Sequence, residues 1–333
     1  MGRRASNARN AWSSRRALVV ELDDGEGCRG QGEAAPLEGY SPDSFEEVET
    51  VLRRLLGSEL AAVPEEGLPP SARFALETAW LDLAARRSGC SLPELLGVPS
   101  SLRVSICASV EPGALERKVA SVAEAWKRGF RCFKVKIGAA GEWRRELELI
   151  SELRRGFGGE LRLRADANGA FDAASLPAVL DALEPLGVEL LEEPVTGAAW
   201  AGVKESRLTL GADESLQRLS PEVLEAFDRG VLRVAVLKPT TLGGPSRCLA
   251  LADRLSRAGA GYVVGHAFEG PLGLAACAAV ALALAARRAP ALAAGLDRHP
   301  GLSAWPEIPL PFEPGCQLGP WSVPGLGIDV RPP

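Results

Sequence analysis

LRLRADANGAFDAASLPAVLDALEPLGVELLEEP, residues 161–194, contains the unit from which we predict the fold. It begins with an apolar, strand-like run that ends in Asp166 and Asn168. A helix-like run follows, and a second strand-like run then ends in Glu192–Glu193. A strand, a helix and a second strand in succession are the pattern of a parallel β/α unit. The stretch therefore predicts two neighbouring parallel strands with polar residues at their carboxyl ends.

The same alternation continues along most of the chain. Strand candidates separated by helix-like runs lie at 102–110, 130–138, 161–168, 188–194, 208–215, 232–239 and 261–268, with a weak one at 292–297. About eight parallel β/α units fit a closed barrel better than an open sheet. Upstream, a strand candidate at 17–22 and helix-like segments at 44–56 and 71–87 are typical of a small α+β domain.

Composition and charge limit the class of protein. The 333 residues are 46% hydrophobic and 24% charged, as in folded globular chains, and the net charge of −5 gives no nucleic-acid footprint. Seven scattered cysteines without a C-x-x-C pair indicate reduced thiols, and two histidines argue against a histidine-rich site. The start lacks the apolar core of a secretory signal, and the Ala-rich run 273–286 is too short to span a bilayer. We expect a soluble, cytoplasmic protein with no nucleic-acid or membrane partner.

Charged side chains gather at the ends of five successive strand candidates after the first. They are Lys134 and Lys136, Asp166 with Asn168, Glu192–Glu193, Asp213–Glu214, and Lys238. Singly, each has an ordinary explanation, such as a turn at Asp166 or a helix cap at Asp213. Their spacing, however, is about one β/α unit each time, and in a barrel the carboxyl ends of the strands converge where active sites lie. The pattern therefore predicts a shared site with three carboxylates between lysines.

Three carboxylates at one mouth repel each other unless a cation joins them. Oxygen ligands without clustered His or Cys select a hard divalent ion, with Mg²⁺ as the natural choice and Mn²⁺ as a substitute. Period-two alternation in the strand puts Cys132, Lys134 and Lys136 on one face. Two ammonium groups beside a dication lower each other's pKa, which makes one of them a usable base near neutral pH.

These motifs resemble the enolase superfamily, in the branch that holds muconate-lactonizing enzyme and o-succinylbenzoate synthase. The resemblance runs from about residue 17 to residue 330 and rests on FKVKIG (133–138), RADANGAF (164–171), LLEEPV (190–195), GADESL (211–216) and VLKPTTLGG (236–244), with GQGEAAP (30–36) upstream. It implies an α/β fold, the enolase-type modified TIM barrel (β/α)7β over residues 100–300. An α+β capping domain would cover residues 1–99 and be completed by the tail, about 301–333. The family's usual opening strand is poorly matched before residue 17. The first part of the capping domain is therefore expected to be shortened, either because the start of this sequence is late or because the chain closes its site differently.

The resemblance also implies roles for the strand-end residues. Asp166, Glu192 and Asp213 resemble the three Mg²⁺ ligands, with Glu192 preferred over Glu193 because relatives often have Gln at the second position. Lys136 resembles the base and Lys134 the lysine that tunes it and contacts the substrate carboxylate. Lys238 resembles the second acid/base or cation on the opposite face of the substrate. Asn168 and Glu214 would lie behind the metal ligands and lysines and hold their side chains in position.

The substrate is inferred from the last two strand candidates. GHAFEGPLG (265–273) resembles the region in which backbone amides of o-succinylbenzoate synthases receive the succinyl carboxylate, so Gly265, His266 and Glu269 are candidate substrate contacts. His266 either lines the pocket or is a partly buried strand-end histidine. Asp297 stands without the Asp-x-Asp pair by which dipeptide epimerases hold an α-ammonium group, which argues against a dipeptide substrate.

The resemblance favours o-succinylbenzoate synthase, a Mg²⁺-dependent lyase of menaquinone synthesis that acts on a small-molecule carboxylate. An N-succinylamino acid racemase, or another racemase or epimerase of the branch, is the alternative. A catalytically silent barrel that serves as a binding module is the alternative of another class. Loss of a ligand or a lysine would indicate it, and none is missing. The oligomeric state is left open, with a homo-oligomer as one option.

Overall fold

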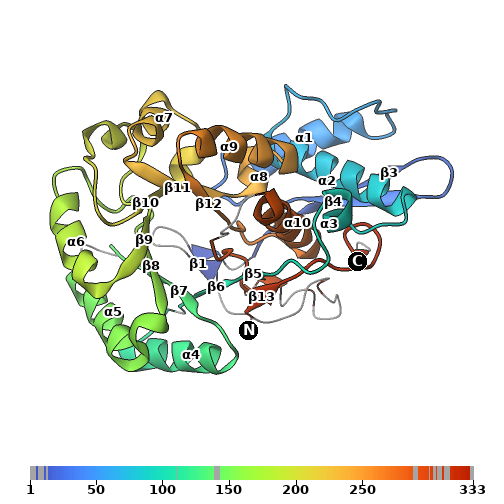
Figure 1. Cartoon of the computed structure of the whole chain (residues 1–333). Coiled ribbons are helices and arrows are strands. Elements are labelled where there is room, and N and C mark those ends of the chain that lie inside the picture. The colour runs from blue at the N-terminus through green and yellow to red at the C-terminus, as the bar shows by residue number, and fades with distance from the viewer. Residues whose placement is uncertain are drawn as a thin grey trace.

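The structure is a computed structural model. It describes residues 5–6, 11–12, 14–110, 112–138, 143–287, 292–299, 301–302, 305, 310 and 316–330. A curled parallel sheet with helices along its outside forms one part of the molecule, and a smaller domain of a hairpin and helices lies against it (Figure 1). The α/β barrel predicted from the alternation is confirmed.

The parallel sheet contains seven strands in sequential order. They are β6 (Cys107–Ser109), β7 (Cys132–Lys136), β8 (Arg162–Asp166), β9 (Val188–Glu192), β10 (Leu210–Ala212), β11 (Leu232–Leu237) and β12 (Gly261–Val264). Each lies inside one of the predicted strand candidates. Their order follows the chain because every crossover returns to the next strand in the same direction.

The eighth, weak strand candidate closes the ring as isolated bridges. Ala294 bridges Ile106 beside β6, and Gly295 bridges Gly265 at the end of β12. The Cys107 N–H donates to the Ala294 oxygen at 2.8 Å, and the Gly295 N–H donates to the Val264 oxygen at 2.8 Å. The sheet is therefore a closed barrel whose last position is held by very few ladder bonds.

Helices cover the barrel in most of the intervals between strands. They are α4 (Leu115–Lys127), α5 (Trp143–Phe157), α6 (Leu176–Leu183), α7 (Pro221–Asp228), α8 (Pro239–Leu242), α9 (Pro245–Arg257) and α10 (Pro271–Arg287), with short 3-10 turns η2 (Gly158–Glu160), η3 (Glu184–Leu186) and η5 (Glu214–Gln217). Between β9 and β10 the expected α-helix is replaced by a 3-10 segment, η4 (Gly197–Gly202). Two glycines at its ends weaken α-helix formation, and the buried Trp200 holds the segment in place.

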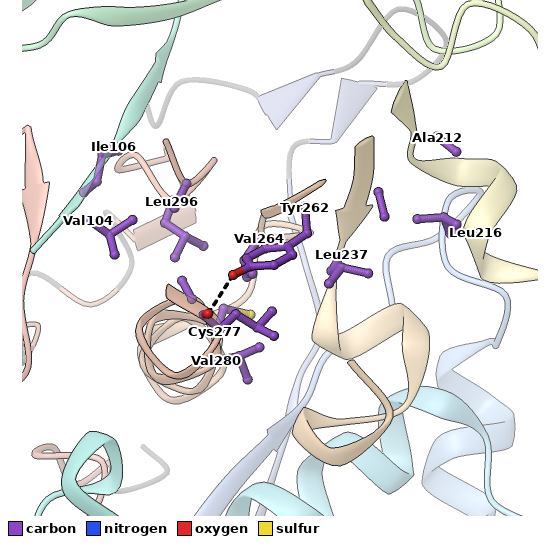
Figure 2. Close-up of a cluster of buried hydrophobic side chains, with 14 of the residues drawn as sticks. Val104, Ile106, Ala212, Leu216, Leu237, Tyr262, Val264, Cys277, Val280 and Leu296 are labelled. Atoms are coloured by element: carbon purple, nitrogen blue, oxygen red, sulfur yellow. Dashed lines mark hydrogen bonds between the residues drawn. The ribbon is translucent and has the colours of Figure 1, made fainter. Parts of the chain in front are cut away.

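Helix α10 accounts for the most apolar stretch of the chain. Every residue from Pro271 to Ala285 is buried, because this helix packs both on the barrel and on the smaller domain. Figure 2 shows side chains of α10 meeting those of β11 and β12, where the Tyr262 hydroxyl donates to the Leu284 oxygen at 2.6 Å. No helix in the described ranges has the length and hydropathy needed to cross a membrane.

The smaller domain begins with an antiparallel hairpin of β3 (Leu18–Asp23) and β4 (Arg29–Ala34), followed by α1 (Phe45–Leu55), α2 (Pro70–Arg87) and α3 (Leu92–Leu95). Helix α2 lies directly on β4 because two glycines face it. A Cβ on Gly32 would lie 2.0 Å from the Ala75 oxygen, and one on Gly30 would lie 2.2 Å from the Ala79 oxygen. The two helices predicted at 44–56 and 71–87 are confirmed.

The chain's end returns to this smaller domain. Strand β13 (Gln317–Leu318) pairs with β5 (Val104–Ser105), and the Leu326 N–H then donates to Asp82 Oδ1 at 2.6 Å. The Val330 N–H donates to Gln31 Oε1 at 2.9 Å. These contacts support the division into a capping domain (1–99 with about 301–333) and a barrel (100–300), which stays a prediction. Much of 301–333 lies outside the described residues.

The residues before the capping hairpin form a separate pair, β1 (Ala5–Ser6) and β2 (Ala11–Trp12). Among the described residues, β1 and β2 pair only with each other, so they add no strand to the β3–β4 sheet. Trp12 Nε1 donates to the Glu38 oxygen at 2.9 Å, and its ring lies 5.9 Å from that of Phe268. The β1–β2 pair thus lies near the end of β12.

Candidate active site

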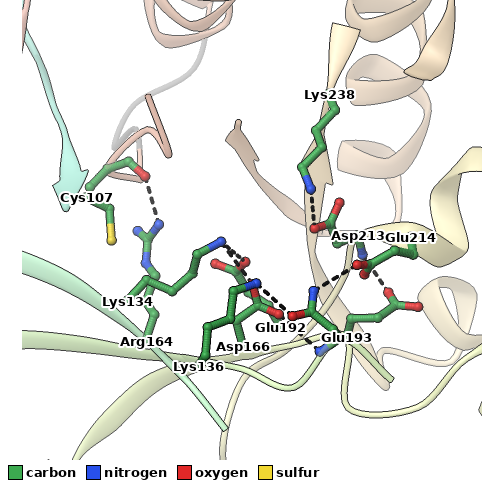
Figure 3. A network of polar contacts seen from close by, with 12 residues as sticks. Cys107, Lys134, Lys136, Arg164, Asp166, Glu192, Glu193, Asp213, Glu214 and Lys238 are labelled. Atoms are coloured by element: carbon green, nitrogen blue, oxygen red, sulfur yellow. Dashed lines mark hydrogen bonds and ion pairs between the residues drawn. The ribbon is translucent and has the colours of Figure 1, made fainter. Parts of the chain in front are cut away.

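The predicted strand-end residues meet at one mouth of the barrel (Figure 3). Register places Lys136 opposite Asp166, and Asp166 opposite Glu192, on three neighbouring strands. Lys134 Nζ lies 3.0 Å from Glu192 Oε2 and 3.1 Å from Asp166 Oδ2, while Lys136 Nζ lies 2.6 Å from Asp166 Oδ2. Parallel pairing therefore brings residues 26 to 58 positions apart into direct contact.

Lys238 approaches the same carboxylates from the other side. It follows β11, and its Nζ lies 2.5 Å from Asp213 Oδ2. A Cβ on Gly265 would lie in ordinary van der Waals contact with Lys238 Cε, at 3.7 Å, so Gly265 lies beside the lysine stem. The lysines of β7 and the lysine after β11 thus flank the carboxylates of the strands between them.

The three carboxylates are almost completely buried. Asp166, Glu192 and Asp213 are 1%, 1% and 3% exposed. Burial alone raises the pKa of Asp166, but the ammonium groups of Lys136 and Lys134 lower it more, so this pKa lies below its usual range. Burial opposes the charged form of Lys134 as well, yet Glu192 and Asp166 raise its pKa above the usual range. The site is a compact network of buried opposite charges.

The donor set fits a hard divalent cation. Three buried carboxylates from successive strand ends supply oxygen ligands, and the ammonium groups of three lysines contact them. In the described part of the chain, no three His, Cys, Asp or Glu side chains are already gathered as a metal site.

Glu193 turns away from the lysines. Its Oε2 accepts a bond from the Asp213 N–H at 2.7 Å, and its Oε1 accepts bonds from the Ser215 N–H at 3.0 Å and the Ser215 hydroxyl at 2.5 Å. Its backbone has a positive φ of 40°. Glu193 therefore fixes the end of β10, which leaves Glu192 as the glutamate of this pair that faces the mouth.

Asn168 and Glu214 form a second layer behind Lys136. Lys136 Nζ donates to Asn168 Oδ1 at 2.7 Å, and Asn168 Nδ2 donates to Glu214 Oε1 at 2.8 Å. Asn168 has a φ of 44°, a left-handed conformation that Asn adopts more readily than most residues. Burial and the neighbouring Asp213 raise the pKa of Glu214 to about 7. Among the described atoms, Glu214 Oε2 is buried without a hydrogen-bond partner.

His266 and Glu269 lie in the segment after β12 and face structural partners. His266 Nδ1 accepts from the Phe268 N–H at 3.1 Å, and its ring lies 4.7 Å from that of His299. Burial and His299 hold the pKa of His266 well below its usual range. Glu269 is fully buried and accepts from the Thr240 hydroxyl at 2.5 Å and the Ala267 N–H at 2.8 Å. Roles for Gly265, His266 and Glu269 in substrate binding stay predictions.

The amides at the start of α10 already have a carboxylate partner. Glu33 of β4 accepts bonds from the Gly270 N–H at 2.6 Å and the Gly273 N–H at 3.0 Å. Burial raises the pKa of Glu33. Sequence reasoning missed this contact between the two domains, although Glu33 lies within the GQGEAAP motif, because nothing local in the sequence pairs residue 33 with residue 270.

Tyr40 is the other residue that sequence reasoning missed. It lies in the loop after β4, and its hydroxyl contacts Lys238 Nζ and donates to Asp213 Oδ1 at 3.2 Å. Lys238 Nζ also lies 4.6 Å from the centre of the Tyr40 ring. A lone tyrosine in a loop carries no sequence signal for such a position, which only the three-dimensional contact reveals.

Comparison with known proteins identifies the family. Residues 118–333 match the model of the enolase C-terminal domain-like family. The chain is 30% identical to chloromuconate cycloisomerase of Cupriavidus pinatubonensis over 268 residues, which cover 74% of this chain and 72% of that protein. It is 28% identical to o-succinylbenzoate synthase of Desulfotalea psychrophila over 320 residues, which cover 83% and 85%.

A solved structure agrees with these matches. A dipeptide epimerase from Enterococcus faecalis, complexed with Mg and the dipeptide L-Leu-L-Tyr, superposes with a TM-score of 0.84 at 23% identity, over 98% of this chain and 95% of that one. The chain belongs to the enolase superfamily, in the subgroup of muconate cycloisomerases, o-succinylbenzoate synthases and dipeptide epimerases.

Proposed function

We propose that this protein is a Mg²⁺-dependent o-succinylbenzoate synthase. The observation that carries the proposal is the pairing of three buried carboxylates with lysines on two sides. The chain is also 28% identical to a synthase over 83% of this chain and 85% of that protein. The eighth segment supports this choice among relatives. Asp297 is the only acidic residue in 292–299, so the acidic pair that would hold a dipeptide's ammonium group is lacking there.

In this proposal Asp166, Glu192 and Asp213 hold Mg²⁺ or Mn²⁺. The ion, when bound, supplies positive charge to the carboxylate of the substrate, 2-succinyl-6-hydroxy-2,4-cyclohexadiene-1-carboxylate. Lys134 contacts the same carboxylate, and Asn168 Oδ1 orients the Lys136 Nζ through the 2.7 Å contact. The chain's own residues thus orient the C–H bond that breaks.

Lys136, as the neutral amine, removes the proton from the carbon next to the carboxylate. The electron pair of that C–H bond moves into the carboxylate and then returns to form the new ring double bond as the β-hydroxyl leaves. Lys136 gives its proton to that hydroxyl, so one water is released and the amine is restored. The aromatic ring of the product favours the reaction. Lys238 remains an ammonium group that stabilises the negative charge from the opposite face.

A racemase acting on N-succinylamino acids is the second candidate. The observation that favours it is the presence of a lysine on each side of the carboxylates, Lys136 on β7 and Lys238 after β11. Two bases on opposite faces are what racemisation requires, since one removes the proton and the other returns it. Either activity would be that of a cytoplasmic enzyme acting on a small carboxylate, and the synthase would serve menaquinone synthesis.

The first experiment gives the purified protein the cyclohexadiene carboxylate with Mg²⁺ and follows the loss of its ultraviolet absorbance. Parallel samples contain EDTA or the Lys136→Ala variant. Turnover that both treatments abolish is expected. Deuterium exchange into an N-succinylamino acid without dehydration would move the function to the racemase. Absence of both reactions, with no Mg²⁺ binding by calorimetry, would favour the silent barrel.

A further inference from the structure

Two cysteines meet at the end of the barrel opposite the charged mouth. Cys107 is the first residue of β6 and Cys132 is the first residue of β7, and the register of this parallel pair places them directly opposite each other. They are 3% and 2% exposed and form a small buried cluster with Ala293. The two thiols therefore lie together on the barrel floor, by which we mean the amino-terminal ends of its strands.

The spacing of the two strands suits a disulfide bond. Directly opposed residues on neighbouring strands have Cα atoms about 4.8 Å apart, and a disulfide needs roughly 4.4–6.8 Å between its Cα atoms. The side chains point the same way, since the Cys132 thiol hydrogen-bonds to the Cys107 sulfur. A bond between the two sulfurs therefore requires no change in the register of β6 and β7.

The charges around the thiols favour a thiolate. Glu189 of β9 pairs with Arg162 Nε at 2.8 Å and with Arg164 Nε at 2.7 Å, so two arginines stand against one glutamate. Arg164 points toward Cys107 (Figure 3), and its Nη2 is buried without a hydrogen-bond partner among the described residues. The hydrogen bond from Cys132 and the charge of Arg164 lower the pKa of the Cys107 thiol, against the effect of burial. A thiolate beside an arginine is the form of cysteine that reacts with oxidants.

The groups that cover the thiols leave a small molecule two ways to reach them. Ala293, which packs on both cysteines, directly precedes the residues that pair with the barrel through isolated bridges. On the other side, Cys132 Sγ lies 3.7 Å from Glu189 Oε1, and the Glu189 side chain is 27% exposed. A small oxidant can therefore reach the pair beside Ala293 or past Glu189.

We propose that Cys107 and Cys132 react with a peroxide and form a disulfide that joins β6 to β7. The Cys107 thiolate attacks one peroxide oxygen and the O–O bond breaks. The sulfur becomes a sulfenic acid, and the released hydroxide takes up a proton to form water. The Cys132 thiol then attacks this sulfur, the S–O bond breaks, and its proton leaves with the hydroxide as a second water. The two thiols thereby lose two electrons and two protons, which reduce one peroxide to two waters. The proposal does not depend on the enzyme's substrate, because neither cysteine is among the proposed metal ligands or bases.

Two other buried cysteines supply the internal comparison. Cys248 of α9 and Cys277 of α10 are fully buried, and burial raises the pKa of both thiols. Neighbouring carboxylates, Glu77 for Cys248 and Glu269 for Cys277, raise these pKa values further. Both cysteines should therefore stay reduced under conditions that oxidise the pair on the barrel floor.

The test treats the reduced whole chain with hydrogen peroxide and maps the products by mass spectrometry of the unreduced digest. A cross-link between the peptides that contain Cys107 and Cys132 is expected, and dithiothreitol should reverse it. Titration of thiols in denaturant should show the loss of the same two groups. The proposal is wrong if Cys107 and Cys132 stay reduced while other cysteines are oxidised, or if Cys107 and Cys277 react at equal rates.

Three variants separate the attacking sulfur from its partner. Cys132→Ser removes the second thiol, so Cys107 should accumulate as a sulfenic acid that dimedone traps. Cys107→Ser should slow the oxidation of Cys132 about ten-fold or more, because the thiol with the lowered pKa is gone. Cys248→Ser is the control and should form the cross-link as fast as the unaltered protein. A Cys107 that stays a free thiol in Cys132→Ser, or a Cys132 that is oxidised at an unchanged rate in Cys107→Ser, would overturn the proposal.

Discussion

The barrel sheet and the capping sheet differ in whether their edge strands are paired. In the barrel every strand from β6 to β12 has a neighbour on both sides, because the bridges of Ala294 and Gly295 close the ring. In the part of the capping domain that the structure describes, β3 pairs with β4 on one side and with no strand on the other. A closed sheet satisfies its backbone and presents function through side chains at the strand ends, whereas an open sheet presents its backbone. The two sheets therefore differ in what they present, which is side chains at the strand ends in the barrel and backbone groups at the edge in the capping domain.

The largest effect is expected at the closed sheet's mouth. Asp166→Asn keeps the shape of the side chain but removes the charge that two lysines contact at 2.6 and 3.1 Å. If Asp166 holds the metal, the variant should lose about 10³-fold or more in kcat/KM for the cyclohexadiene carboxylate, and Mg²⁺ binding should weaken in calorimetry. Glu59→Gln, in the loop between α1 and α2, is the control and should keep full turnover. Similar activity of both variants would contradict the assignment of the ligands.

The next largest effect is expected where the capping sheet meets α2. Gly32→Val places a side chain where a Cβ would already lie 2.0 Å from the Ala75 oxygen. The helix must move, so the free energy of unfolding should fall by about 3 kcal/mol or more in urea titration. Gly156→Ala is the matched control, since nothing lies within 4 Å of its Cβ position in α5. It should stabilise the protein by about 0.5–1 kcal/mol. Equal effects would mean that the glycines of β4 do not set the distance to α2.

A smaller effect is expected from Glu214 as the pH changes. Burial and Asp213 raise its pKa from 4.5 to about 7. The folded protein therefore holds this proton more tightly than the unfolded chain, and stability should fall as the pH rises from about 4.5 to 7. In EDTA, Glu214→Gln should remove about 1–3 kcal/mol of that decline while its amide oxygen still accepts from Asn168. Urea titrations at pH 4.5 and 7 measure it. An unchanged pH slope in the variant would show that another group titrates.

The smallest effect is expected at Tyr40, which connects the two regions. Tyr40→Phe removes the hydroxyl that contacts Lys238 and Asp213 but keeps the ring beside the ammonium group. A loss of about ten-fold in kcat/KM is expected, with little change in Tm. Tyr262→Phe, at the chain's second tyrosine, removes a hydroxyl that bonds to the Leu284 oxygen between β12 and α10. It should cost about 1 kcal/mol of stability and leave kcat/KM unchanged. The reverse pattern would remove Tyr40 from the site.

The barrel and the charged residues at its mouth could be predicted from the sequence because both follow from local sequence patterns. Each strand is a short apolar run, and Lys136, Asp166 and Glu192 fall at the ends of successive runs, so parallel pairing alone brings them together. Even the weak eighth strand candidate was predictable, although its pairing is reduced to bridges.

The contacts that could not be predicted are those between elements far apart in the chain. Glu33 bonds to the start of α10, and Tyr40 reaches Lys238, across 237 and 198 positions. No period or spacing in the sequence encodes such pairs, because they depend on how the capping domain is placed on the barrel.

The bridges at Ala294 and Gly295 have a consequence for local unfolding. A ring held at one position by so few ladder bonds opens there at a lower free energy than elsewhere. We expect the amides of Cys107 and Gly295 to exchange with deuterated solvent before those of β8 and β9. The carboxylates of Asp166 and Glu192 lie on those slowly exchanging strands. The barrel can therefore open locally between β12 and β6 while these carboxylates keep their positions.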